Sequence, residues 1–142
     1  MKTMEVKLSR LIPGPIDEVF DVWFDPARPG GPWGEGAVKA LMSFAVDGMF
    51  YFATQRPNGL HAHFGRFTSI ERSRSVTHTW MSENTRGLET TVNVTFEPQT
   101  GGTLMTIVHS GLPDDEGGRR HEAGWTHFLT RIDQRFEKEA KA

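Results

Sequence analysis

The sequence predicts an α+β fold in which a curved antiparallel sheet of about six to seven strands wraps around a long C-terminal helix, with two short helices near the N-terminus. Apolar and polar residues alternate through most of the chain, which is typical of strands buried on one face. Turn sequences such as Asp47-Gly48 and Gly101-Gly102 separate these stretches and favour antiparallel hairpins. Near the end, apolar residues change to helical spacing at Trp125, Phe128, Leu129, Ile132 and Phe136.

The composition limits the classes of protein to which the chain can belong. With 142 residues, the chain is expected to form one domain over residues 1–142. The absence of cysteine excludes disulfides, thiolate chemistry and cysteine-ligated zinc. A formal net charge of −2, from 16 basic and 18 acidic residues, gives no sign of a nucleic-acid partner. No apolar run approaches the ~20 residues of a membrane span, and no signal peptide is visible, so we expect a cytoplasmic protein.

The N-terminal third predicts one strand followed by two helical pieces. Arg10 interrupts the inward face of the opening strand, on which Val6, Leu8 and Ile12 lie. Pro15 suits the first position of a helix, and the next residues have the apolar spacing of a short amphipathic helix. Asp25-Pro26 has the form of an N-cap followed by proline and predicts the second short helix. Glycine and proline between residues 28 and 34 predict a loop.

The remaining strands are predicted from alternation between turns. A strand is expected from about Val38 to Phe44, and five more follow. Their inward faces are predicted to carry Phe50, Phe52 and Thr54; His61, His63, Gly65 and Phe67; Val76, His78 and Trp80; Val92, Val94 and Phe96; and Met105, Ile107 and His109.

The C-terminal helix is predicted to begin after a break at residues 110–115. Asp114, Asp115 and Glu116 suit a helix N-terminus, where acidic groups complement the dipole. Arg119-Arg120 is interpreted as a solvated helix face. Gly117-Gly118 weakens the first turn, which leads to the hypothesis that the segment from Ser110 to Arg120 is mobile and gates a pocket.

These landmarks resemble the activator-of-heat-shock-protein-90-ATPase homologue family, within the START-like (SRPBCC, helix-grip) superfamily. The resemblance extends from Ile16 to Phe136. It is carried by the order of Ile16–Trp23 with Asp25-Pro26, Trp33-Gly34, Gly48–Phe52, His63–Phe67, Val76–Trp80, Val92–Phe96, Gly101–Thr103, His109–Leu112 and His121–Trp125. One departure is that only Val46-Asp47-Gly48 stands where the family often has Asp and Arg before two glycines. The chain resembles single-domain bacterial-type members, which match only the C-terminal domain of the eukaryotic co-chaperone, so a chaperone is not the partner we expect.

The resemblance implies a cavity between the concave face of the sheet and the C-terminal helix. Its candidate ligand-binding residues are Phe50, Phe52, His63, Phe67, His78, Trp80, Val92, Val94, Met105 and Ile107 on the sheet, and Trp125 and Phe128 on the helix. A concave apolar wall with a few inward polar groups is the usual form of a small-molecule site. The alternative is that these side chains meet and fill the space, and periodicity does not decide between the two.

Histidines are the most unusual residues on the predicted inward faces. An inward histidine costs desolvation unless it finds a hydrogen-bond partner, and it suits orienting a polar ligand group or moving a proton near neutral pH. His61 and His63 are spaced to chelate a metal, but no third ligand is evident, so we predict no metal site. Ser110 and His109 fall on opposite strand faces and cannot pair for catalysis. No nucleophile elbow, P-loop or dinucleotide fingerprint is present, so no catalytic residue and no cofactor is predicted.

Three classes of function remain open. We expect a non-enzymatic binder of a small hydrophobic or amphipathic molecule, in stress or detoxification. The first alternative is an enzyme of the START-like superfamily that uses His63, His78 or His109 as acid or base. The second is a chaperone co-factor that acts through its surface. The identity of the ligand does not follow from the sequence, and a homodimer also stays open.

Overall fold

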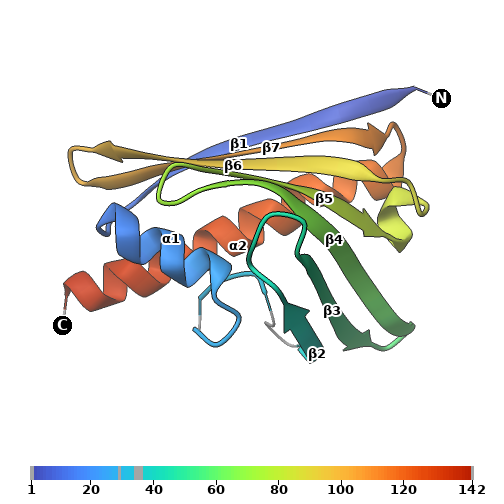
Figure 1. Ribbon diagram of the computed structural model, residues 1–142, viewed down its shortest axis with the longest axis horizontal. Helices are drawn as coiled ribbons and strands as arrows, with labels where there is room; N and C mark the ends of the chain where they lie inside the picture. The colour runs from blue at the N-terminus through green and yellow to red at the C-terminus, as the bar shows by residue number, and fades with distance from the viewer. Residues whose placement is uncertain (1, 29, 34–36, 142) are drawn as a thin grey trace.

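A computed structural model describes residues 2–28, 30–33 and 37–141, and it has the predicted α+β helix-grip fold. Seven antiparallel strands form one curved sheet in the order β1-β7-β6-β5-β4-β3-β2, and helix α2 lies across its concave face (Figure 1). The elements are β1 (Thr3–Ile12), α1 (Ile16–Phe24), β2 (Ala37–Met42), β3 (Met49–Arg56), β4 (Gly59–Glu71), β5 (Ser75–Ser82), the 3₁₀ turn η1 (Glu83–Thr85), β6 (Thr90–Gln99), β7 (Gly102–Pro113) and α2 (Glu116–Ala140).

Short hairpins connect β2 through β7, so consecutive strands lie side by side. Strand β1 pairs with the last strand, β7, and α1 carries the chain from this edge of the sheet towards β2 at the other edge. The predicted alternation holds across the centre of the sheet, where Val76, Val94 and Ile107 occupy one row of adjacent strands and are fully buried. The concave face is therefore lined by the side chains that the sequence assigns to it.

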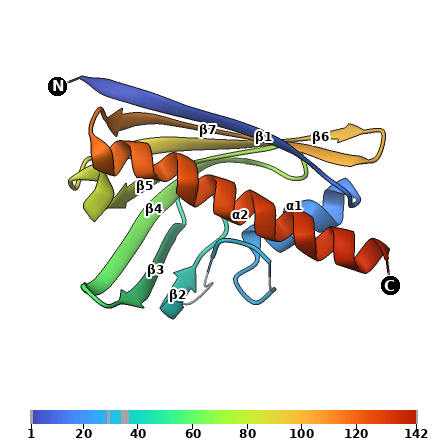
Figure 2. The ribbon, with the colours of Figure 1, turned by 180° about the vertical axis from the view of Figure 1, so that it is seen from behind.

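Helix α2 runs obliquely over the sheet from the η1 end to the α1 end (Figure 2). It begins where predicted, because the Asp115 carboxylate caps the helix by accepting a 2.9 Å hydrogen bond from the Gly118 N–H. That bond, together with the Arg86 guanidinium 2.7 Å away, lowers the pKa of Asp115. The structure assigns residues 110–113 to β7 and the residues from Glu116 onward to α2, and the mobility of the segment from Ser110 to Arg120 stays a prediction.

The C-terminal half of α2 packs tightly against the N-terminal part of the chain. Its buried residues Ile132 and Phe136 belong to the same core as α1, and a Cβ at Gly14 would lie only 2.4 Å from the Phe136 ring. Arg10, which interrupts the inward face of β1, donates to the Asp133 carboxylate on α2 at 2.6 Å. This end of the molecule is a filled core.

Among the described residues that follow α1, a turn stands in place of the second short N-terminal helix. After α1 ends, the Asp25 side chain accepts a 2.9 Å hydrogen bond from the Ala27 N–H, and its carbonyl accepts one from the Arg28 N–H at 3.1 Å. These bonds close a turn, so the cap-like sequence Asp25-Pro26 serves a turn instead of a helix. None of the helices built from the described residues is long and apolar enough to cross a membrane.

Candidate functional site

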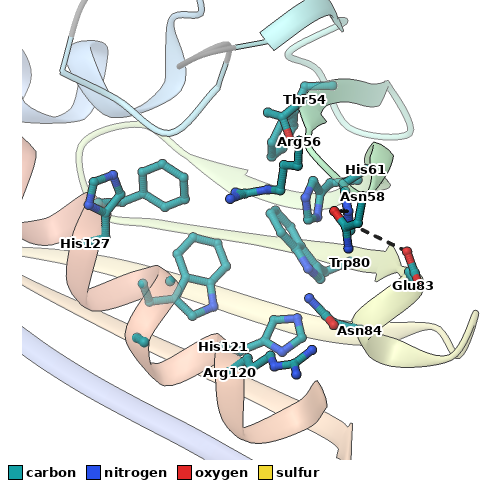
Figure 3. A pocket seen from close by; sticks show the side chains of 16 residues that line it. Thr54, Arg56, Asn58, His61, Trp80, Glu83, Asn84, Arg120, His121 and His127 are labelled. Atoms are coloured by element: carbon teal, nitrogen blue, oxygen red, sulfur yellow. Dashed lines mark hydrogen bonds and ion pairs between the residues drawn. The ribbon is translucent and has the colours of Figure 1, made fainter. Parts of the chain in front are cut away.

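A pocket of about 690 Å³ opens between the N-terminal half of α2 and the β3–β4 end of the sheet (Figure 3). Strands β3, β4 and β5 form one side, η1 closes one end, and α2 forms the opposite side. It is lined by Phe52, Thr54, Arg56, Asn58, His61, His63, Trp80, Glu83, Asn84, Arg120, His121, Ala123, Gly124, Trp125, His127 and Phe128.

Four aromatic rings form the apolar wall of the pocket. Trp80 on β5 contacts Trp125 on α2 with ring centroids 5.0 Å apart. Within the wall, Trp80 also contacts Phe52 at 5.8 Å, and Trp125 also contacts Phe128 at 6.2 Å. Beside this wall, Gly124 presents only backbone: a Cβ built there has no heavy atom within 4 Å. The rings and the open space next to them suit a flat or chain-like apolar body.

A polar rim lies at the β3–β4 hairpin. His61 Nε2 and Asn58 Oδ1 form a 2.9 Å hydrogen bond, and His61 Nδ1 lies 3.6 Å from the Glu83 carboxylate (Figure 3). The Arg56 side chain extends over the pocket in the same view. The rim therefore presents hydrogen-bonding and charged groups beside an aromatic wall.

His63 is the most buried polar residue that β4 contributes to the pocket. Its ring stacks on Phe52 with centroids 4.7 Å apart. Burial, followed by the charges of His121, Arg56 and His61, lowers the pKa of His63 to about 4. The imidazole is therefore neutral at pH 7, and its Nδ1 has no hydrogen-bond partner within the described part of the chain.

His121 on α2 holds one tautomer. Its Nδ1 lies 3.0 Å from the Gly117 carbonyl and 3.2 Å from that of Gly118, so Nδ1 carries the proton and donates to both. The Nε2 lone pair is then left as an acceptor. Burial lowers the pKa of His121, against the opposing effect of the two carbonyls. With its tautomer fixed, the neutral ring offers Nε2 as an acceptor, and its lowered pKa makes it a weaker base than a free imidazole.

Behind the pocket, His109 connects α2 to the sheet through a chain of hydrogen bonds. The Trp125 indole N–H donates to His109 Nδ1 at 3.0 Å, and His109 Nε2 lies 2.7 Å from the Thr90 hydroxyl. That hydroxyl donates in turn to the Trp80 carbonyl at 2.6 Å. Burial, reinforced by the charges of His121 and His78, lowers the pKa of His109 to about 2. The neutral ring thereby positions the two tryptophans of the pocket wall.

His78 is fully buried and lies outside the pocket lining. Its Nδ1 donates to the Thr79 carbonyl at 2.8 Å, and its ring contacts Phe50 edge to face with centroids 5.2 Å apart. Burial lowers its pKa to about 4, so His78 is a neutral member of the core.

The structure divides the twelve predicted ligand-binding residues into two groups. Five line the pocket: Phe52, His63, Trp80, Trp125 and Phe128. Seven are buried outside it in the filled part of the sheet: Phe50, Phe67, His78, Val92, Val94, Met105 and Ile107. The concave face is therefore hollow where the first five residues lie and filled where the other seven lie.

Several lining residues were not predicted from the sequence. Arg56 continues the alternation of Phe52 and Thr54, so its inward position was readable from the pattern. His121 precedes Trp125 by four residues and therefore lies on the same helix face. Arg120, interpreted as part of a solvated face, lines the pocket mouth and pairs with Glu116 at 3.1 Å. Across the described ranges, no group of three histidine or carboxylate side chains is placed to hold a metal ion.

Comparison with known proteins identifies a family. The family model for Activator of Hsp90 ATPase homolog 1-like protein matches residues 13–137. A search of curated proteins finds no match.

Several solved structures share the fold. A protein from Chromobacterium violaceum is 23% identical, with a TM-score of 0.77 over 94% of this chain and 98% of the other. One from Rhizobium leguminosarum is 19% identical, with a TM-score of 0.77 and 96% of both chains covered. An AHSA1-like protein from Aeromonas hydrophila is 19% identical, with a TM-score of 0.74 over 96% of this chain and 94% of that one. At these identities the likeness shows the fold alone.

Proposed function

The chain belongs to the Activator of Hsp90 ATPase homolog 1-like family, and we propose that it binds a small amphipathic molecule in the pocket between α2 and the β3–β4 end of the sheet. The family and its START-like fold support ligand binding in general terms. The observation that carries the proposal is the pocket itself, which combines about 690 Å³ of space with an aromatic wall and a polar rim.

The pocket favours an amphipathic ligand over a purely apolar one. Phe52, Trp80, Trp125 and Phe128 offer rings to an apolar body, whereas Arg56, Asn58 and His61 offer polar groups at the rim. A ligand with no polar group would displace water from the Arg56 guanidinium without replacing its hydrogen bonds, which costs free energy. A stress or detoxification role is consistent with such binding and is part of the proposal.

A matched pair of variants at Gly124 tests the proposal. Because a Cβ at this position meets open space, Gly124→Ala adds only a methyl group, whereas Gly124→Phe places a ring in the pocket. We expect the neutral fluorescent probe N-phenyl-1-naphthylamine to bind the wild type and Gly124→Ala alike, and Gly124→Phe at least about tenfold more weakly. Native mass spectrometry of the purified wild type, followed by extraction, would then identify any bound molecule. Equal probe binding by all three proteins would contradict the proposal.

A second candidate function, acid–base catalysis, is favoured by the fixed tautomer of His121. Its Nε2 lone pair is oriented by the Gly117 and Gly118 carbonyls, which is how a general base is held. If the extracted molecule is a reactant, His121→Gln would slow its conversion by about 10² to 10⁴-fold while leaving its binding within a few-fold of the wild type. Recovery of the molecule unchanged after prolonged incubation with the wild type would exclude this function.

A further inference from the structure

We propose that the ligand of this pocket is an organic acid and that Arg56 binds its anionic group, a carboxylate or sulfonate, while the aromatic wall holds the body of the molecule. This inference rests on the proposed function and specifies the chemical class of the ligand. It follows from the position and partners of the charged groups at one end of the pocket.

Arg56 is the cation available to a ligand. It is the last residue of β3, on the same face as Phe52 and Thr54, and its side chain extends over the pocket (Figure 3). No carboxylate of the described residues lies within 4 Å of its guanidinium, whereas the other lining arginine, Arg120, is paired with Glu116 at 3.1 Å. A guanidinium presents two parallel N–H donors that match the two oxygens of a carboxylate.

The charges of the lining favour an anionic ligand over a cationic one at this end. Glu83 is the single carboxylate among the lining residues; its side chain is 78% exposed and lies 3.6 Å from His61 Nδ1. Glu83 therefore lies at the exposed rim and contributes no buried negative charge to the pocket. A ligand cation would therefore face Arg56 with no buried anion to offset the repulsion, whereas an anion would gain charge-assisted hydrogen bonds.

Two fluorescent probes share an aromatic skeleton, but only one of them carries an anionic group. Comparing them distinguishes recognition of the anion from binding of the apolar body. We would measure the fluorescence binding of 1-anilinonaphthalene-8-sulfonate, which carries a sulfonate, and of neutral N-phenyl-1-naphthylamine at pH 7.5 and fixed ionic strength. The variant is Arg56→Gln. The control is Arg66→Gln, which removes an exposed arginine on the outward face of β4, outside the pocket lining. Gly124→Phe tests whether both probes bind in this pocket, because Gly124 lines it and a ring there would occupy part of its space.

We expect Arg56→Gln to weaken binding of the sulfonate about tenfold and to leave binding of the neutral probe unchanged, with Arg66→Gln affecting neither. Gly124→Phe should weaken both. If the neutral probe binds and Arg56→Gln changes the two affinities equally, or neither of them, the assignment of an organic acid is overturned and the pocket remains a binding site. Sulfonate binding that persists in Gly124→Phe would place the probe elsewhere and also overturn it. Failure of both probes to bind the wild type would overturn the proposed function and this inference together.

Discussion

The indole N–H of Trp125 donates a 3.0 Å hydrogen bond to Nδ1 of His109, joining the helix to the last strand of the sheet behind the pocket. Both residues are buried. His109 can accept this bond only while it is neutral, and its other nitrogen is then free to donate to Thr90. One ring therefore holds the tryptophan that lines the pocket.

Replacing His109 with leucine is expected to lower the free energy of unfolding by about 1–3 kcal/mol, because the buried Trp125 N–H loses its acceptor. Urea denaturation at pH 7.5 measures the loss. Trp125→Phe and the double variant complete a mutant cycle. If the hydrogen bond matters, the double variant should lose less than the two single losses added together. Strict additivity would contradict the coupling.

The free energy of unfolding should decrease as the pH is lowered below about 6.5. Burial lowers the pKa of His78 to about 4 and of His109 to about 2, from 6.5 in the unfolded chain. Between pH 6.5 and about 4, the unfolded state therefore binds more protons than the folded state, and each of the two histidines removes about 1.4 kcal/mol per pH unit as the pH falls. The free energy of unfolding, measured by urea at pH 7.5, 6.0 and 5.0, should decline accordingly. His78→Leu should have a shallower slope, and an unchanged slope would refute its contribution.

Adding one methyl group should have opposite effects at two glycines. At Gly65, a Cβ would lie 2.1 Å from the Thr79 carbonyl oxygen and 2.8 Å from the Phe50 ring, so Gly65→Ala should destabilise by about 2 kcal/mol or more. At Gly124, nothing lies within 4 Å, and Gly124→Ala should stabilise the helix by about 1 kcal/mol. Thermal unfolding compares the two variants. Equal shifts of the same sign would contradict the packing described for Gly65.

The ion pair between Arg10 and Asp133 should contribute more than the exposed pairs on the same helix. Its atoms are 2.6 Å apart, and the Asp133 side chain is 17% exposed. Asp133→Asn is expected to cost about 1 kcal/mol, whereas Glu137→Gln, which breaks the exposed Glu137–Lys141 pair, should change stability by less than about 0.5 kcal/mol. Denaturation in low and high salt compares them. Equal small losses would show that Asp133 adds nothing beyond a surface charge.

Alternation along strands is sufficient to predict which face of the sheet each side chain occupies. Val92, Val94 and Ile107 lie inward as expected, and the helical spacing of Trp125 and Leu129 identifies the face of α2 that meets them. These are local periodicities fixed by backbone geometry, so they can be read from the chain. The predicted single N-terminal strand, the terminal helix and its acidic start all follow from the same reasoning.

Alternation could not predict which inward-facing side chains line the pocket and which are buried away from it. Phe50 and Phe52 are two residues apart on the same face of β3, yet Phe52 lines the pocket and Phe50 lies outside it. The difference depends on how far α2 lies from each part of a twisted sheet, which is a property of the assembled fold. The second short helix was predicted wrongly for a related reason: Asp25 can cap either a helix or a turn, and the following residues decide which.

The two halves of α2 make different contacts. Residues after Leu129 hold the helix against β1 and α1 through Ile132, Asp133 and Phe136, whereas a Cβ at Gly124 would meet open space. If the proposed pocket binds a ligand, substitutions at Ala123 and Gly124, which are exposed and line the pocket, should alter binding at little cost to folding. A library randomised at these positions alone should retain mostly folded members with altered ligand preference, which makes this stretch the natural starting point for redesign.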